Sequence, residues 1–249
     1  RYTRKPPKTM KPAENVVIRL CSIEYCFAHP LDGEECQENV DFKNLLQAWG
    51  KLCKRMYIWD YTTNFAHYTA PFPNLAVLWD NIQLFKNNGV AGIYEQGNYQ
   101  SLSGEFGELR GYLLSNLLWN PDMTKEEYFA MMDEFLEAYY GPGWRHIRKY
   151  IDKTSEKAAQ THLHIYDKPD QYRPAGDVDE ETGMPFADLM TQLWDKALEE
   201  AQTEAQKKHV RKSRIQNEYS DLYTDFAGQT QLNQDFYESL KEAGITWFN

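Results

Sequence analysis

Short apolar runs alternate with amphipathic stretches along the first part of the chain. The runs at 16–23, 56–60 and 90–95 contain mainly β-branched and aromatic residues, and their lengths are those of buried strands. Between them, apolar residues recur every three or four positions at 45–53 and 75–85, which is the spacing of one helix face. A succession of strand, helix, strand, helix and strand favours a parallel sheet.

The connections between these elements are unequal in length. Each predicted helix is followed within a few residues by a strand, whereas the strand-to-helix loops at 24–39 and 61–74 are long and contain many polar and aromatic residues. Long loops at the carboxyl ends of parallel strands are where α/β sheets and barrels place their sites. Three strands cannot close a barrel, which needs about eight, so the pattern alone does not separate an open sheet from a barrel.

The chain becomes helical after about residue 105. Thr124 and Glu127 have the spacing of a capping box, in which each side chain accepts a hydrogen bond from a free backbone amide. The segment 166–184 is rich in turn residues and predicts a surface excursion. Helical periodicity predicts helices at 105–119, 124–139, 144–160, 186–203, 205–227 and 231–243.

Two carboxylates stand where predicted strands end. Glu95 follows the apolar run 90–94, and Asp60 has the same position one strand earlier. If the two strands are neighbours, their ends lie about 5 Å apart, and glycosidases use carboxyl pairs separated by roughly 5 to 9.5 Å. We therefore take Asp60 and Glu95 as candidate catalytic residues. The alternatives are that Glu95 pairs with Arg110 and that Asp60 caps the turn that follows it.

Rings and amides gather around these acids, a combination that suits sugar faces and hydroxyls. Taken singly, each ring is better explained by packing and each histidine by a role as a loop anchor, whereas Glu24 is equally explained by pairing with Arg19 or with a neighbouring loop. The candidate substrate-binding residues are Glu24, His29, Trp59, Tyr61, Asn64, Tyr94, Gln96, Asn98 and Tyr99.

No motif in the chain predicts a metal or a cofactor. The sequence has no G-x-S-x-G elbow and no phosphate-binding glycine loop. His29, Asp32, Asp60 and His67 lack a recognised metal-ligand spacing. The four cysteines have no C-x-x-C pair, which favours free thiols, with a Cys26–Cys36 disulfide as the alternative. The cysteines are Cys21, Cys26, Cys36 and Cys53.

Charge and hydropathy exclude two classes of partner. The net charge of the 249-residue chain is −10, so the basic footprint of a nucleic-acid or anionic-membrane protein is missing, and the basic stretch 207–212 lies in a helix dense in acids. No apolar run approaches the ~20 residues of a membrane span. No secretory leader opens the chain, whose first residue, Arg1, is not a natural start. Periplasmic, extracellular and cytoplasmic locations all stay open.

Several motifs resemble a bacterial family known as "domain of unknown function 4838", whose members are expected to be glycoside hydrolases. The resemblance covers most of residues 1–160. Its motifs are Tyr2-Thr3-Arg4-Lys5-Pro6-Pro7, Cys26-Phe27-Ala28-His29-Pro30-Leu31, Tyr57-Ile58-Trp59-Asp60-Tyr61, Asn64-Phe65, Pro71-Phe72-Pro73-Asn74, Gly92-Ile93-Tyr94-Glu95-Gln96-Gly97, Glu105-Phe106-Gly107-Glu108-Leu109-Arg110, Leu118-Trp119-Asn120-Pro121 and Tyr139-Tyr140-Gly141-Pro142.

The resemblance implies the C-terminal part of a (β/α)8 TIM barrel followed by a helical region, related at clan level to α-glucuronidases and hexosaminidases. We expect barrel strands and helices over 1–118 and a mostly helical region over 119–249. The earlier strands, with the proton donor, are expected in the missing N-terminal part of a longer parent chain. The predicted function is hydrolysis of a glycosidic bond in a poly- or oligosaccharide by strand-end carboxylates. The alternative is a non-catalytic carbohydrate-binding or scaffold protein.

Overall fold

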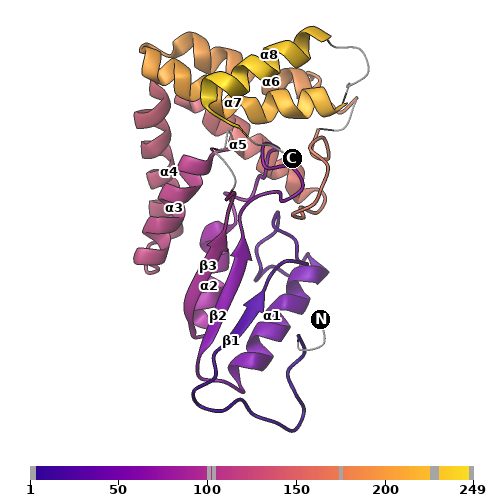
Figure 1. Ribbon diagram of the computed structural model, residues 1–249, viewed down its shortest axis with the longest axis vertical. Coiled ribbons are helices and arrows are strands. Elements are labelled where there is room, and N and C mark those ends of the chain that lie inside the picture. The colour runs from indigo at the N-terminus through magenta and orange to yellow at the C-terminus, as the bar shows by residue number, and fades with distance from the viewer. Residues whose placement is uncertain (1–3, 100–101, 103–104, 174–175, 225–229, 247–249) are drawn as a thin grey trace.

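The computed structural model describes residues 4–99, 102, 105–173, 176–224 and 230–246 (Figure 1). Tyr2 and Thr3, which belong to the first family motif, and the predicted helical residues 225–227 lie outside this part. The described chain is a mixed α/β structure, as the sequence predicts. At one end lies a parallel sheet, and at the other end helices cross one another in a stack.

The sheet contains the three predicted strands, β1 (Ile18–Cys21), β2 (Met56–Tyr61) and β3 (Val90–Gln96). They are parallel, and their order in the sheet is β1-β2-β3. The prediction of parallel pairing is therefore confirmed. The sheet formed by the described residues is open, so the closed barrel is not part of this structure and stays a prediction.

Helices α1 (Gln37–Gly50) and α2 (Leu78–Asn87) connect the strands. Alternate residues of a strand point to opposite faces of a sheet. Leu20, Met56 and Ile58 therefore share one face, and they are buried in the same apolar cluster as Phe42 of α1 and Phe85 of α2. Both connecting helices thus cover one face, and the opposite face carries the side chains of Arg19, Tyr57, Trp59 and Tyr94.

The remaining helices confirm the periodicity of the sequence with small shifts at their ends. The capping box at the start of α4 is formed, with Thr124 and Glu127 each accepting from the backbone amide of the other. No helix among the described residues is long and apolar enough to cross a membrane. The remaining helices of the chain are α3 (Gly107–Trp119), α4 (Lys125–Tyr140), α5 (Trp144–Ala159), α6 (Phe186–Glu200), α7 (Glu204–Thr224) and α8 (Thr230–Ala243).

The main apolar core runs through both halves of the chain. Its buried residues extend from Leu20 in β1 to Val210 in α7, so side chains on both sides of residue 118 pack into one cluster. A 3-10 turn at Gly141–Gly143 joins α4 to α5. The division into 1–118 and 119–249 stays a prediction, and the sheet and the helices share this core.

Candidate functional site

The carboxylates of Asp60 and Glu95 belong to one row across the sheet. Asp60 is the register partner of Glu95 on the neighbouring strand. Ser22 continues the row on the other side, because it follows Cys21, the partner of Trp59, and its hydroxyl donates a hydrogen bond to the Asp60 carboxylate. The structure therefore brings the two predicted catalytic residues together at the carboxyl end of the sheet and adds Ser22, which the sequence analysis did not select.

Asp60 lies in a dry environment. The residue is only 3% exposed, and its Oδ1 also accepts a hydrogen bond from the backbone amide of Tyr61 at 2.9 Å. Burial raises the pKa of Asp60 to about 6, although the hydrogen bonds from Ser22 and Tyr61 oppose that rise. Asp60 thus changes its charge near neutral pH. Its bond to the amide of Tyr61 lies within β2, so the predicted capping of the turn that follows stays a prediction.

Glu95 has a raised pKa for two reasons. Burial of the carboxyl is the larger cause, and the neighbouring charge of Asp60 is the second. Its Oε2 is buried and has no hydrogen-bond partner among the described residues. The alternative in which Glu95 pairs with Arg110 is wrong, because Arg110 binds Glu105 instead. Both causes therefore favour the protonated form of Glu95, which lies beside a second ionisable group.

A cavity of about 630 Å³ opens next to Glu95, between β3 and α3. The buried ion pair of Glu105 and Arg110 contributes to its wall, with Arg110 Nη1 2.5 Å from Glu105 Oε2. The polar lining includes Thr62, Thr63, Asn98, Glu108 and Ser115, and the apolar lining includes Ile93, Leu102, Leu114 and Leu118. Glu95 lines this cavity, and Asp60 lies behind it in the same row.

The predicted sugar-stacking rings are placed on the other face of the sheet. Trp59 and Tyr94 are register partners and pack edge to face at 5.6 Å between ring centroids. Trp59 also stacks on Tyr61 and donates from Nε1 to Gln96 Oε1 at 2.6 Å. Tyr94 is 54% exposed. The four residues form one aromatic and amide cluster on the face opposite the carboxylates, in which Tyr61 is buried and Tyr94, on the edge strand β3, also reaches the cavity lining.

The other predicted binding residues have separate environments. The exposed Glu24 pairs with Arg4 rather than with Arg19. Asn64 is buried and anchors its loop, because its Nδ2 donates to Asp167 O and its Oδ1 accepts from the amides of Ala66 and His67.

Three further predicted residues complete the set. Asn98 lines the cavity, and Tyr99 is exposed at the strand exit, with its ring edge to face with that of Tyr68. His29 is held away from these residues, with Nδ1 3.1 Å from Cys26 Sγ and Nε2 2.9 Å from Ala159 O. Of the predicted binding residues, only Tyr94 and Asn98 line the cavity with Glu95.

The fold and this site define a class: α/β proteins with a pair of interacting carboxylates at the carboxyl end of a parallel sheet. Residues 1–152 match the family model described as Domain of unknown function (DUF4838). The chain belongs to this family, and the matched part contains the sheet, the cavity and helices α1 to α4. Comparisons with curated proteins and with solved structures found no match.

Proposed function

We propose that the protein is a glycoside hydrolase in which Glu95 is the general acid and Asp60 sets its protonation. The observation that carries this proposal is the buried Glu95 Oε2, which has no partner among the described residues, lines the cavity and lies beside Asp60. A general acid must hold its proton at the working pH and reach the leaving group. Burial and the Asp60 charge favour the protonated form of Glu95.

The roles of the two carboxylates follow from their positions. Glu95 would donate its proton to the glycosidic oxygen as the bond to the sugar carbon breaks. Asp60 lies beside Glu95 in the row, not across a sugar ring from it, and therefore does not take the place of the opposing carboxylate. The family resemblance led us to expect the proton donor in a missing N-terminal part; in this proposal Glu95 takes that role, and the group that activates water, or attacks the sugar, would come from strands that complete a barrel in a longer parent chain.

The winding of the sheet supports this barrel proposal. Strands β1, β2 and β3 follow one another in the sheet in chain order, and both crossover helices lie on one face. Parallel strands are normally buried on both faces, and single winding with all helices outside is the arrangement of (β/α)8 barrels. In such a barrel the surface of Trp59, Tyr61, Tyr94 and Gln96 would face the interior.

The leaving group of the substrate provides the test. A panel of natural oligosaccharides and aryl glycosides is assayed with the full natural protein and with its Glu95→Gln variant. Loss of a general acid should lower turnover of natural substrates by roughly 10²-fold or more. It should change turnover of dinitrophenyl glycosides much less, because that leaving group departs without a proton. Glu134→Gln, at an exposed position of α4 outside the cavity lining, is the matched control and should keep both activities.

Two results would overturn the assignment. One is that Glu95→Gln retains full turnover of natural substrates. The other is that it loses activity equally on activated and natural substrates, which would indicate a structural effect or a nucleophile in place of a general acid.

A non-catalytic carbohydrate-binding role is the second candidate, and the open ring surface favours it. Arg19 lies over the Trp59 ring at 5.7 Å, and Tyr57 and Tyr94 are exposed beside it. In that case Trp59→Ala and Tyr94→Ala would weaken binding of an oligosaccharide, Glu95→Gln would leave it unchanged, and no reducing ends would appear with any variant.

A further inference from the structure

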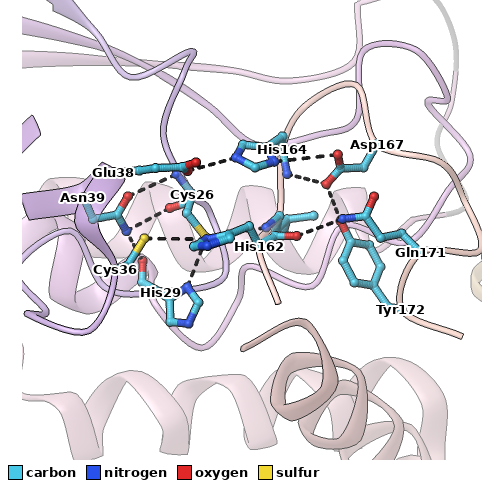
Figure 2. A network of polar contacts seen from close by, with 11 residues as sticks. Cys26, His29, Cys36, Glu38, Asn39, His162, His164, Asp167, Gln171 and Tyr172 are labelled. Atoms are coloured by element: carbon cyan, nitrogen blue, oxygen red, sulfur yellow. Dashed lines mark hydrogen bonds and ion pairs between the residues drawn. The ribbon is translucent and has the colours of Figure 1, made fainter. Parts of the chain in front are cut away.

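Two cysteines and two histidines lie close together where the loop between β1 and α1 contacts the segment that follows α5. The donor atoms of Cys26, His29, Cys36 and His162 all lie within 4.8 Å of one another. Cys26 Sγ is 3.1 Å from His29 Nδ1, and Cys36 Sγ is 3.7 Å from His162 Nδ1. All four cysteines of the chain are free thiols. Figure 2 shows the two sulfur atoms and the imidazole rings directed toward a common point.

Asn39 of α1 fixes the backbone that carries two of these donors. Its side chain is fully buried and forms hydrogen bonds in both directions with Cys26, accepting from N and donating to O. Its Nδ2 is also 2.9 Å from His29 O and 3.3 Å from Pro30 O. Cys36 immediately precedes α1, one turn before Asn39. One buried amide therefore holds the loop of Cys26 and His29 against the helix end that carries Cys36.

The fourth donor is brought in by the segment that follows α5. Phe27 N donates to Leu163 O at 2.9 Å, and Leu163 N lies 3.5 Å from Cys26 Sγ. His164, next to Leu163, forms ion pairs with Glu38 of α1 and with Asp167. These contacts place His162 beside Cys36 although 126 residues separate them in the chain.

The hydrogen bonds around the donors match those of metal ligands. His29 Nε2 donates to the carbonyl of Ala159 at 2.9 Å, an arrangement that leaves the Nδ1 lone pair directed at the sulfurs. The Leu163 amide near Cys26 Sγ and the start of α1 at Cys36 both place positive dipole ends near sulfur. Imidazole rings held by a carbonyl and thiolates near backbone amides are the common surroundings of a bound transition metal.

We propose that Cys26, His29, Cys36 and His162 bind one Zn²⁺ ion in a tetrahedral Cys2His2 site. Zinc bonds of about 2.0–2.3 Å put tetrahedral ligand atoms roughly 3.3–3.8 Å apart, so small side-chain movements would complete the shell. Four protein ligands leave no open position, and the ion is structural. Sequence motifs for zinc sites depend on ligand pairs that are close together in the chain, such as C-x-x-C. No such motif predicts this site, because its fourth ligand follows α5.

The ion would tie the helical region to the sheet. Three ligands follow β1 or precede α1, and the fourth follows α5. The apolar cluster around the two cysteines also contains Tyr61 at the end of β2, with Trp59 packed against it. Loss of the ion should therefore loosen the 160–167 segment and the strand-end loops together. This site is independent of the activity proposed for Glu95.

Metal content and cobalt substitution test the proposal. Protein purified under reducing conditions without chelator should contain one zinc per chain, and Co²⁺ loading should give sulfur-to-cobalt charge-transfer bands and intense tetrahedral d–d bands. Cys36→Ser and His162→Ala should each weaken metal binding by at least tenfold. Cys53→Ser and His146→Ala, which change the same residue types elsewhere, should keep the full metal content.

Because His162 is exposed, His162→Ala should fold normally and keep the circular dichroism spectrum of the wild type. A loss of metal binding in this variant can therefore not be explained by misfolding. Chelator should lower the melting temperature of the wild type and of Cys53→Ser, and leave that of His162→Ala unchanged. Substoichiometric zinc with no cobalt bands in the wild type would overturn the proposal. A Cys26–Cys36 disulfide found by mass spectrometry in protein purified without reductant, with no bound metal, would overturn it in favour of the disulfide.

Discussion

The hydroxyl of Ser22 donates a hydrogen bond to the carboxylate of Asp60, from the end of one strand to the end of the next. Both this bond and that from the Tyr61 amide favour the charged form of Asp60, against the larger effect of burial, and the resulting pKa is about 6. Ser22 thus acts on the charge that raises the pKa of Glu95. The pair depends on a third residue that is neither acidic nor aromatic.

Ser22→Ala should raise the pKa of Asp60 by about one unit, because a hydrogen bond to a charged group is worth about 1.5 kcal/mol or more. Carbon-13 NMR of labelled aspartate carboxyls across a pH series measures this shift. Ser115→Ala is the control, since Ser115 lies in the cavity wall with its hydroxyl on Tyr112 O. An unchanged Asp60 titration in Ser22→Ala would show that the hydroxyl has no effect on the acid.

The stability of the protein should depend on pH through Asp60. Its pKa is raised from 3.8 to about 6 in the folded state, so the folded state retains a proton that the unfolded chain releases between these values. The contribution of Asp60 to the free energy of unfolding is therefore fully present below pH 4 and is lost as the pH rises through 6. The loss amounts to about 3 kcal/mol. The raised pKa of Glu95 acts in the same direction.

Asp60→Asn removes the titration while it keeps an oxygen that accepts from Ser22 and Tyr61. The difference in unfolding free energy between variant and wild type should grow in favour of the variant from pH 4 to pH 7, as measured by urea unfolding. The difference is the useful quantity, because Asp179, whose pKa is lowered to about 2 by Lys153, contributes with the opposite sign in both proteins. A difference that is constant over this range would contradict the raised pKa.

The sequence predicted the elements and the adjacency of the acids, because apolar periodicity and chain order determine both. It did not predict which groups share a face. Asp60 lies between Trp59 and Tyr61 in a regular strand, so the acid and the rings must point in opposite directions. The alternation of side-chain directions along β2 already separates Asp60 from its neighbouring rings in the sequence. Only the packing of α1 and α2 shows which of the two faces is covered.

Contacts between distant segments were beyond sequence reasoning. The partner of Arg110 is Glu105 and not the strand-end Glu95, because both side chains bind the backbone of Phe72 in the loop that follows β2. His162 reaches Cys36 only through the packing of α5 and its following segment. Local spacing carries no information about the second pair, whose members are 126 residues apart.

The buried ion pair of Arg110 and Glu105 should be essential for stability. Arg110 also donates to Asn74 Oδ1 at 3.1 Å and to Phe72 O at 2.9 Å, so its loss leaves the buried Glu105 carboxylate without its counter-ion and takes a donor from both acceptors. Arg110→Met should destabilise the fold by roughly 3–5 kcal/mol.

The double variant Glu105→Gln/Arg110→Met should lose less than the sum of the two single variants, because no unpaired charge remains. Urea unfolding measures all three. Lys54→Met, at the exposed pair with Glu14, is the control and should change stability by less than about 1 kcal/mol. Additive losses in the double variant would show that the two side chains act separately.

Gly143, at the turn between α4 and α5, should not tolerate a side chain. Its φ of −73° suits any residue, so backbone conformation does not require glycine. A Cβ at this position would lie 2.6 Å from Ala197 O and 2.7 Å from Ala197 Cα, and both are atoms of the α6 backbone. Gly143→Ala must therefore push α6 away, which should cost roughly 1–3 kcal/mol.

Gly111 in α3 is the matched control for Gly143, because a Cβ there meets nothing within 4 Å. Gly111→Ala should stabilise the protein by up to about 1 kcal/mol through helix propensity alone. Melting temperatures should therefore move in opposite directions for the same chemical change, downward for Gly143→Ala and upward for Gly111→Ala. If Gly143→Ala melts at or above the wild-type temperature, α6 does not press on this turn, and the contact that joins α5 to α6 lies elsewhere.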